Sequence, residues 1–301
     1  MVLIINNDNV SFDHIEKGDN NIEHKLVPPC AYQGGKQRIA NKIVDIIYKY
    51  SNINDNIKFY DLCCGSGSVS IEMVNHEFLP FNITMVDKSP WGLFWKQVGN
   101  STFSTDVFKY YLDDIPKDLS KIKGYMQGLA DTPVYNTQTD ITYLFLMLQA
   151  SAFGSTATWI ENEHWKKAGG LRNYWQPTKT SNRRSPVNPM MPMPDSLLER
   201  CEQLVMGMEG VNGYYDDCNN IKIEPNSIIY IDPPYDKTTK YGYDFDYMSF
   251  INTYKKTNTI FLSEGKQLSD IAFNLTDRRS KGGISGNRKT INEEWLNVFI
   301  R

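Results

Sequence analysis

Short apolar runs alternate with polar and glycine-rich segments along this 301-residue chain. Residues 57–62, 81–86 and 227–231 are short, mainly apolar runs, as is typical of strands buried in a parallel sheet. Residues 69–74 form an apolar stretch that indicates a helix, and a second helix is indicated by the spacing of Ile39, Ile43, Ile46 and Ile47. The order of these elements predicts an α/β fold.

A glycine-rich turn joins the first of these strands to the helix after it. The strand contains Asp61, and the turn consists of Cys63, Cys64, Gly65, Ser66, Gly67 and Ser68. Glycines at such a turn let a ligand approach the backbone closely. The turn lacks the third glycine of a dinucleotide-binding fingerprint, so a bound pyrophosphate is the weaker interpretation. Asp87 ends the next strand, where an acidic residue typically accepts hydrogen bonds from ribose hydroxyls.

A second motif follows the strand at 227–231, at the strand end where open α/β sheets bind ligands. It consists of Asp232, Pro233, Pro234 and Tyr235. The Asp232 carboxylate and the Pro233 carbonyl can hold an exocyclic base amine between two acceptors, and the prolines fix the backbone that carries the carbonyl. Tyr235 offers a flat face for a base taken out of its stack. A plain strand-ending turn is the alternative interpretation, because Pro and Asp are common in turns.

A third segment, residues 28–38, contains Tyr32 and the turn Gly34-Gly35-Lys36. Lys36 could meet a ligand carboxylate, although an ordinary loop before a surface helix fits this segment equally well when it is taken alone. The three segments together resemble the amino-methylating DNA methyltransferases that use S-adenosylmethionine. The order of cofactor loop, long insert and catalytic tetrapeptide is similar to the Dam-type adenine-N6 group, the α class.

This resemblance implies a cofactor role for eight residues. Tyr32 and Lys36 would help to hold the methionine part of S-adenosyl-L-methionine, and Asp87 would bind its ribose. Asp217, within residues 215–218, resembles a residue that bonds the cofactor's adenine. The loop under the cofactor would contain Asp61, Cys63, Gly65 and Gly67. Cys63 stands where the family usually has phenylalanine, and Cys218 where it has phenylalanine or tyrosine.

The resemblance also implies catalytic residues and further strands. Asp232, Pro233, Pro234 and Tyr235 would form the catalytic tetrapeptide, and residues 236–247 resemble a loop that closes over a flipped base. Residues 259–263 resemble the next core strand, and residues 288–300 the closing hairpin.

The net charge of −3 does not indicate a nucleic-acid partner, but the distribution of charge does. The segment from His164 to Pro194 carries six basic residues and no acidic ones, with Trp165, Tyr174 and Trp175 among them. Basic side chains neutralise phosphates, and arginine can read guanine. A solvated loop is the alternative interpretation. Together with the resemblance, the segment offers five candidates for binding double-stranded DNA: Lys166, Lys167, Arg172, Arg183 and Arg184.

Composition narrows the class of protein. Hydrophobic residues make up 41% of the chain, and no apolar run is long enough to span a membrane. Residues 1–20 lack the basic start and the cleavage site of a signal peptide. The five cysteines have no zinc-ligand spacing, which indicates reduced thiols and a cytoplasmic location. We expect neither a membrane partner nor a metal.

The expected architecture is a doubly wound, Rossmann-like methyltransferase sheet with an inserted smaller lobe of helices and a hairpin. The catalytic domain would comprise residues 26–95 and 215–301, and the target-recognition domain residues 96–214. Residues 1–25 would be a polar N-terminal arm. The apolar stretch at 143–154 would pack the inserted lobe against the catalytic domain.

The expected reaction is direct methyl transfer to the N6 amine of adenine. Cytosine-N4 methylation is an alternative, although that group more often has serine at the position of Asp232. A non-catalytic DNA-binding relative and a methyltransferase of RNA or protein also stay open. The target site and any partner restriction endonuclease are not determined by the sequence.

Overall fold

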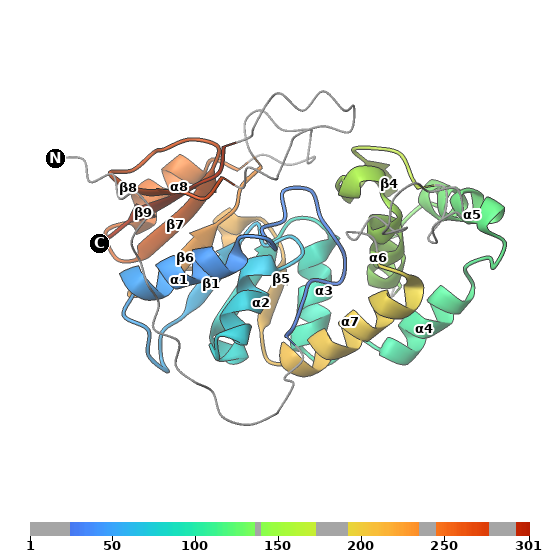
Figure 1. Ribbon diagram of the computed structural model, residues 1–301, viewed down its shortest axis with the longest axis horizontal. Coiled ribbons are helices and arrows are strands. Elements are labelled where there is room, and N and C mark those ends of the chain that lie inside the picture. The colour runs from blue at the N-terminus through green and yellow to red at the C-terminus, as the bar shows by residue number, and fades with distance from the viewer. Residues whose placement is uncertain (1–24, 136–139, 173–191, 235–244, 277–292) are drawn as a thin grey trace.

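The computed structural model describes residues 25–135, 140–172, 192–234, 245–276 and 293–301 (Figure 1). Several predicted parts therefore lie outside the described residues: the expected N-terminal arm apart from Lys25, most of the loop at 236–247, and Arg183, Arg184 and Tyr235. None of the helices within the described ranges is long and apolar enough to cross a membrane.

A seven-stranded sheet in the order β5-β2-β1-β6-β7-β9-β8 forms the centre of the molecule. The three strands predicted from apolar runs are confirmed as β1 (Phe59–Leu62), β2 (Ile83–Asp87) and β6 (Ile228–Ile231). They run parallel to β5 (Asn212–Tyr215) and β7 (Thr259–Glu264). Only β9 (Trp295–Phe299) is antiparallel to its neighbours, β7 and β8 (Ile271–Asn274). The mixed α/β architecture is therefore confirmed, and it is compatible with a Rossmann-like fold.

Helices cover both faces of the sheet (Figure 1). Phe59 and Tyr230 face the cluster that includes α1 (Ala40–Tyr50), α2 (Ser68–Asn75) and α3 (Pro90–Gly99). Residues one position further along the strands, such as Tyr60 and Ile231, face α8 (Tyr247–Tyr254). Because side chains alternate along a strand, burial of both faces explains why the strands are mainly apolar without alternation.

The helix after the Gly34-Gly35-Lys36 turn was predicted with one inaccuracy. Ile43 and Ile47 are fully buried, and Ile39 caps the helix from a buried position. Ile46 is only half-buried, and Val44 takes the core position in its place. The difference arises because the helix has 3.6 residues per turn. This periodicity places Val44 next to Ile43 and Ile47 on the buried face.

Helix α3 lies very close to β5 because glycine occurs where the two elements meet. A Cβ atom at Gly213 would lie 2.1 Å from the backbone nitrogen of Lys96 and 2.3 Å from the carbonyl carbon of Trp95. A Cβ at Gly92 would lie 2.3 Å from the carbonyl oxygens of Asp87 and Tyr214. The glycines therefore set the spacing between this helix and the edge of the sheet.

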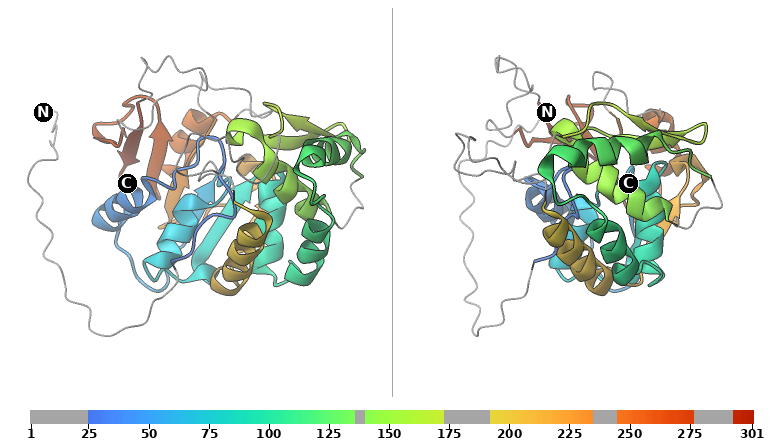
Figure 2. Two further views of the ribbon diagram at one scale, coloured as in Figure 1. Left: turned by 45° about the vertical axis from the view of Figure 1, so that its right-hand side comes forward. Right: turned by 90° about the vertical axis from the view of Figure 1, so that its right-hand side faces the viewer.

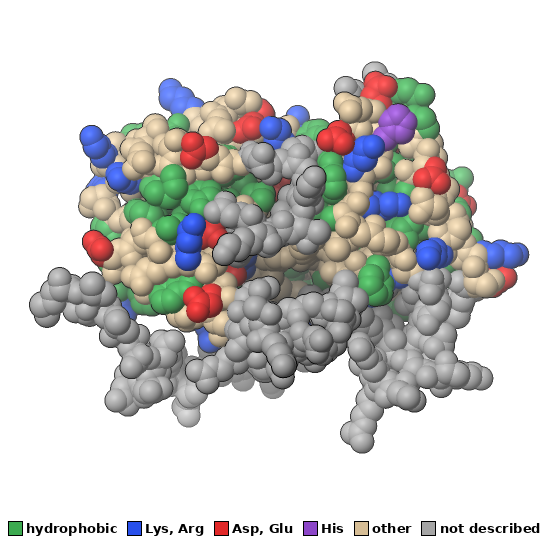
Figure 3. Space-filling view, turned by 90° about the horizontal axis from the view of Figure 1, so that it is seen from above, with side chains coloured by type: hydrophobic (Ala, Val, Ile, Leu, Met, Phe, Trp, Pro, Cys, Tyr) green, Lys and Arg blue, Asp and Glu red, His purple; other side chains and the backbone are tan. Residues whose placement is uncertain are grey.

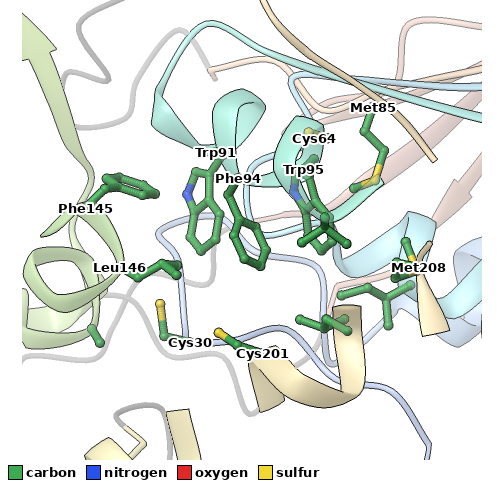
Figure 4. Close-up of a cluster of buried hydrophobic side chains, with 14 of the residues drawn as sticks. Cys30, Cys64, Met85, Trp91, Phe94, Trp95, Phe145, Leu146, Cys201 and Met208 are labelled. Atoms are coloured by element: carbon green, nitrogen blue, oxygen red, sulfur yellow. The ribbon is translucent and has the colours of Figure 1, made fainter. Parts of the chain in front are cut away.

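Further helices are grouped beyond α3 at one end of the sheet (Figure 2). The apolar stretch expected at 143–154 corresponds to α6 (Ile141–Ser151), which is buried along its whole length. It packs against α3, and the ring centroids of Phe145 and Trp91 are 5.1 Å apart (Figure 4). Around it lie α4 (Thr105–Asp113), α5 (Leu119–Asp131), α7 (Pro194–Gly207) and a hairpin of β3 (Thr158–Glu161) and β4 (His164–Lys167).

Candidate active site

The order of strands reverses between β1 and β6, and the loops after these two strands begin side by side. The backbone amide of Asp232 donates to the Leu62 carbonyl, which continues the pairing of β6 with β1. The amide of Cys64 likewise donates to the Val86 carbonyl, beyond the end of β1. Because ligands of open α/β sheets bind where the strand order reverses, this edge is the candidate site.

Asp232 forms an ion pair with Lys36, a residue far away in sequence. The Lys36 ammonium donates to Asp232 Oδ1 at 2.7 Å and to the Gly34 carbonyl at 2.8 Å. Lys36 is 5% exposed and Asp232 19% exposed, so the pair is shielded while the carboxylate still reaches the surface of the site. Among the described residues, none donates a hydrogen bond to Asp232 Oδ2. Pro233 is buried and Pro234 half-buried.

Two acidic residues that were not predicted lie beside this pair. Glu264 ends β7, and Glu294 immediately precedes β9, where its carboxylate lies 3.8 Å from the Lys36 ammonium. Burial raises the pKa of the Asp232 carboxyl to about 6, Glu294 and Glu264 add to the rise, and the Lys36 ammonium opposes it. Burial alone would lower the pKa of Lys36, but the surrounding carboxylates outweigh burial and raise it. The site therefore holds an ionised pair at neutral pH.

The glycine-rich turn has a backbone that a larger residue could not easily adopt. Gly65 and Gly67 have φ angles of 49° and 75°, in the left-handed region. A Cβ at Gly65 would lie 2.9 Å from the ring of Tyr32, so the two predicted cofactor-binding segments touch each other here. The indole nitrogen of Trp95 donates to the Gly65 carbonyl at 2.9 Å, and this hydrogen bond stabilises the turn.

Asp61 lies buried beneath this turn with one oxygen unused. Its Oδ2 accepts a hydrogen bond of 2.6 Å from the Ser70 hydroxyl, whereas its Oδ1 is buried and accepts no hydrogen bond from the described residues. Burial raises the pKa of Asp61 to about 7, although the bond from Ser70 lowers it. A buried acceptor without a donor is costly, and this one is explained if a ligand supplies the donor.

Asp87 connects the end of β2 to the same turn. Its Oδ2 accepts from the Gly65 amide at 2.7 Å and its Oδ1 from the Ser89 amide at 2.8 Å. Burial raises the pKa of Asp87, against hydrogen bonds from Ser89 and Gly65 that lower it. Asp87 therefore fixes the glycine turn, and each oxygen retains a further lone pair that can accept from a ligand.

Cys63 and Cys218, the two cysteines that stand where the resemblance would expect aromatic residues, are in contact. The sulfur of Cys63 lies 3.8 Å from that of Cys218, at the start of the short helix η3 (Cys218–Asn220). The hydrogen bond with Cys218 and burial raise the pKa of the Cys63 thiol well above its usual range. The Cys63 side chain is therefore a neutral thiol, which is a poor nucleophile.

A cavity of about 580 Å³ lies where β2 and β5 end. Asp217 lines it and accepts a hydrogen bond of 2.8 Å from the Lys88 ammonium. The cavity has the volume of a small-molecule site, and polar residues dominate its lining: Lys88, Tyr215, Asp216, Asp217, Asn219 and Asn220.

The described DNA-binding candidates lie apart from this edge, on and after β4. Lys166 is exposed. Lys167 donates to Gln127 at 3.1 Å, and burial lowers the pKa of Lys167. Arg172 donates from Nε to the Ala152 carbonyl at 3.2 Å, its Nη2 is buried and has no partner in the described part of the chain, and burial lowers the pKa of Arg172. On the face shown in Figure 3, Lys and Arg side chains are interspersed with acidic ones.

No model of a known protein family matches the sequence, and a search of curated proteins finds no similar one. Within the described ranges, no group of His, Cys, Asp and Glu side chains could hold a metal ion. The functional assignment therefore rests on the motifs and on the geometry of the site.

Proposed function

We propose that the protein is a site-specific DNA methyltransferase that transfers a methyl group from S-adenosyl-L-methionine to the N6 amine of adenine in a flipped base. The arrangement of Asp232 carries the proposal. Its carboxylate is held by Lys36 through Oδ1, so that Oδ2 can accept a hydrogen bond from a base amine. It lies at the point where the strand order reverses, beside the glycine turn.

The residues around the turn fit the cofactor. Asp61 Oδ1 offers a buried acceptor for its ammonium group, and Asp87 offers lone pairs to the ribose hydroxyls. Asp217 and its neighbours line a polar cavity suited to an adenine ring. Gly65 lets the Tyr32 ring, and Gly67 the Trp95 and Met85 side chains, pack directly against the turn. When bound, S-adenosylmethionine would supply an electrophilic methyl group on its sulfonium.

The residues of the chain would act by positioning and by accepting a proton. Asp232 Oδ2 and the Pro233 carbonyl would hold the amine between two acceptors and direct its lone pair. With a pKa of about 6, Asp232 is ionised at neutral pH and can take up the proton that the amine loses after methylation. The neutral thiols of Cys63 and Cys64 form no covalent intermediate in this scheme.

Double-stranded DNA would contact the expected target-recognition lobe, residues 96–214, which includes the β3–β4 hairpin. The unpaired Nη2 of Arg172 supports this contact, because no described acidic group balances its charge. A partly buried guanidinium without a counter-charge is stabilised by an anionic ligand.

The direct test is incubation of the purified protein with isotopically methyl-labelled S-adenosylmethionine and DNA, followed by chromatography of the nucleosides. We expect the label in N6-methyldeoxyadenosine. Label in N4-methyldeoxycytidine would reassign the base, and tight DNA binding without incorporated label would indicate a binding module.

We expect Asp87→Ala to weaken cofactor binding by about 1–3 kcal/mol, because the ribose loses a charged acceptor and the glycine turn loses the hydrogen bond donated by its Gly65 amide. Calorimetric titration with S-adenosylmethionine measures the change. The exposed Asp45 on α1 provides the matched control, Asp45→Ala, which should bind normally. Unchanged affinity in a folded Asp87→Ala variant would reduce Asp87 to a structural role.

We expect Lys166→Ala to weaken binding to all DNA sequences and to reduce the slope of log K against log salt by about 1, because an exposed ammonium contacts phosphate as a point charge. Arg172→Lys should instead relax the preference at one base by about 1–3 kcal/mol, since lysine lacks the planar fork. Fluorescence-detected binding at several salt concentrations, with methylated positions mapped by sequencing, separates the two effects. Lys255→Ala, at the residue that follows α8, is the control, and a change in neither property would place DNA recognition elsewhere.

A further inference from the structure

Glu294 reaches the active edge of the sheet because its strand runs in the opposite direction to the others. At this edge of the sheet lie the residues that follow the parallel strands. Because β9 runs the other way, the residue at this edge is the one that precedes it, Glu294. The backbone around Glu294 is fixed on both sides. Its carbonyl accepts from the Leu275 amide at 2.8 Å, and its amide donates to the Thr276 hydroxyl at 3.0 Å. The register Glu264↔Trp295 then places the carboxylates of Glu264 and Glu294 at the same edge.

The Lys36 ammonium lies among acceptors from three separate segments. They are the Gly34 carbonyl, Asp232 Oδ1 and Glu294 Oε1, at 2.8, 2.7 and 3.8 Å. Lys36 is almost completely buried, and its contacts with these acceptors hold the end of its flexible side chain beside Asp232 Oδ1.

We propose that Glu294 is a positioning residue for Asp232 and acts through Lys36, within the methyl transfer proposed above. The Glu294 carboxylate, 3.8 Å from the ammonium, attracts it and so limits its motion. Without Glu294, the ammonium could move toward Oδ2, the oxygen that must receive the amine. Glu294 would thus keep one oxygen of Asp232 bound and the other available.

The charges facing Asp232 make this role measurable. Lys36, from the segment before α1, stabilises the ionised carboxylate, whereas Glu294 and Glu264 destabilise it. The other titratable groups that interact with Asp232 come from β1, the turn after it, and β6, and they are Asp61, Cys63 and Tyr230. Removing the charge of Glu294 should therefore lower the pKa of Asp232, and removing that of Lys36 should raise it.

The kinetic experiment compares Glu294→Gln with Glu293→Gln over a range of pH. Glu293 is the matched control because it is the preceding residue, is exposed, and bonds to the Trp295 indole nitrogen at 2.9 Å and not to Lys36. In Glu294→Gln we expect the acid limb of kcat/KM to move on the order of one pH unit lower. The plateau of kcat should fall about tenfold, with the Kd of S-adenosylmethionine within about twofold. Glu293→Gln should match the wild type in all three.

Two further variants sharpen the test. Lys36→Met should move the acid limb to higher pH, the opposite direction from Glu294→Gln. Glu294→Asp keeps the charge and should restore the wild-type limb, whereas a merely structural role would respond to side-chain length and not to charge. Wild-type pH dependence and plateau rate in Glu294→Gln would overturn the proposal.

A titration by carbon NMR of protein labelled at its aspartate carboxyls provides a readout independent of methyl transfer. The Asp232 signal is assigned by its loss in Asp232→Asn. We expect its pKa to fall in Glu294→Gln and to stay unchanged in Glu293→Gln. If no DNA substrate is methylated but this shift is observed, the proposed function fails while the coupling of Glu294 to Asp232 stands. An Asp232 pKa that is the same in both variants would refute the coupling itself.

Discussion

Asp232→Ala is expected to abolish methyl transfer while leaving the affinity for S-adenosylmethionine within a few-fold of the wild type. The carboxylate is partly exposed and bonds Lys36 through Oδ1, so Oδ2 would receive the amine, and the proposed cofactor contacts belong to other residues, mainly Asp61, Asp87 and Asp217. The variant therefore removes the acceptor that orients the amine and takes its proton. Losing a preorganised electrostatic contact of this kind costs about 3 kcal/mol or more of transition-state stabilisation, which is about 150-fold or more in kcat.

Single-turnover methylation at saturating DNA measures this loss, and calorimetry measures cofactor affinity. The Asp232→Ala variant leaves the buried Lys36 with Glu294 and Glu264 as its remaining acidic neighbours, so folding should be verified by circular dichroism. Asp45→Ala, on the exposed side of α1, should show full activity. Turnover of Asp232→Ala within about tenfold of the wild type would remove Asp232 from the reaction.

The sequence predicted those parts of the site that can be recognised from short segments of the chain. Apolar runs identified β1, β2 and β6 because strands buried on both faces have few polar positions. Asp61, Asp87 and Asp232 could be assigned because each lies in or directly after such a run. Their shared location at one edge then follows from parallel strand order.

Contacts between distant segments could not be predicted in the same way. Lys36 and Asp232 are separated by 196 positions, and no local signal connects them. Glu294 was missed because no motif marks it, and its approach to Lys36 depends on how β9 pairs with β7, which the residues around Glu294 do not reveal. Arg172 and Lys167 were grouped with Lys166 by charge alone, but their side chains bond to Ala152 and Gln127 in the structure. Net charge along a segment does not show which basic groups already have partners.

Gly213→Ala is expected to have the largest effect on stability. The added methyl group would meet backbone atoms of α3 at 2.1 and 2.3 Å, and backbone cannot rotate away as a side chain can. Overpacking typically costs about 1–3 kcal/mol, and a clash with backbone on this scale should cost about 3 kcal/mol or more. For a domain of this size, we expect the melting temperature to fall by about 6 °C or more.

The control for this experiment is Gly124→Ala, because Gly124 lies within α5 and nothing would contact its Cβ within 4 Å. That variant should gain about 0.5–1 kcal/mol, since alanine loses less backbone entropy in a helix than glycine. Opposite signs for the same chemical change would show that the clash with α3, and not the loss of glycine, causes the destabilisation of Gly213→Ala. Equal stability of the two variants would contradict the close packing of α3 on β5.

The effect of Gly213→Ala should extend to the active site, because Trp95, which the new methyl group would displace, supports the glycine turn through its bond to the Gly65 carbonyl. Any folded Gly213→Ala protein should therefore also bind S-adenosylmethionine more weakly than the wild type.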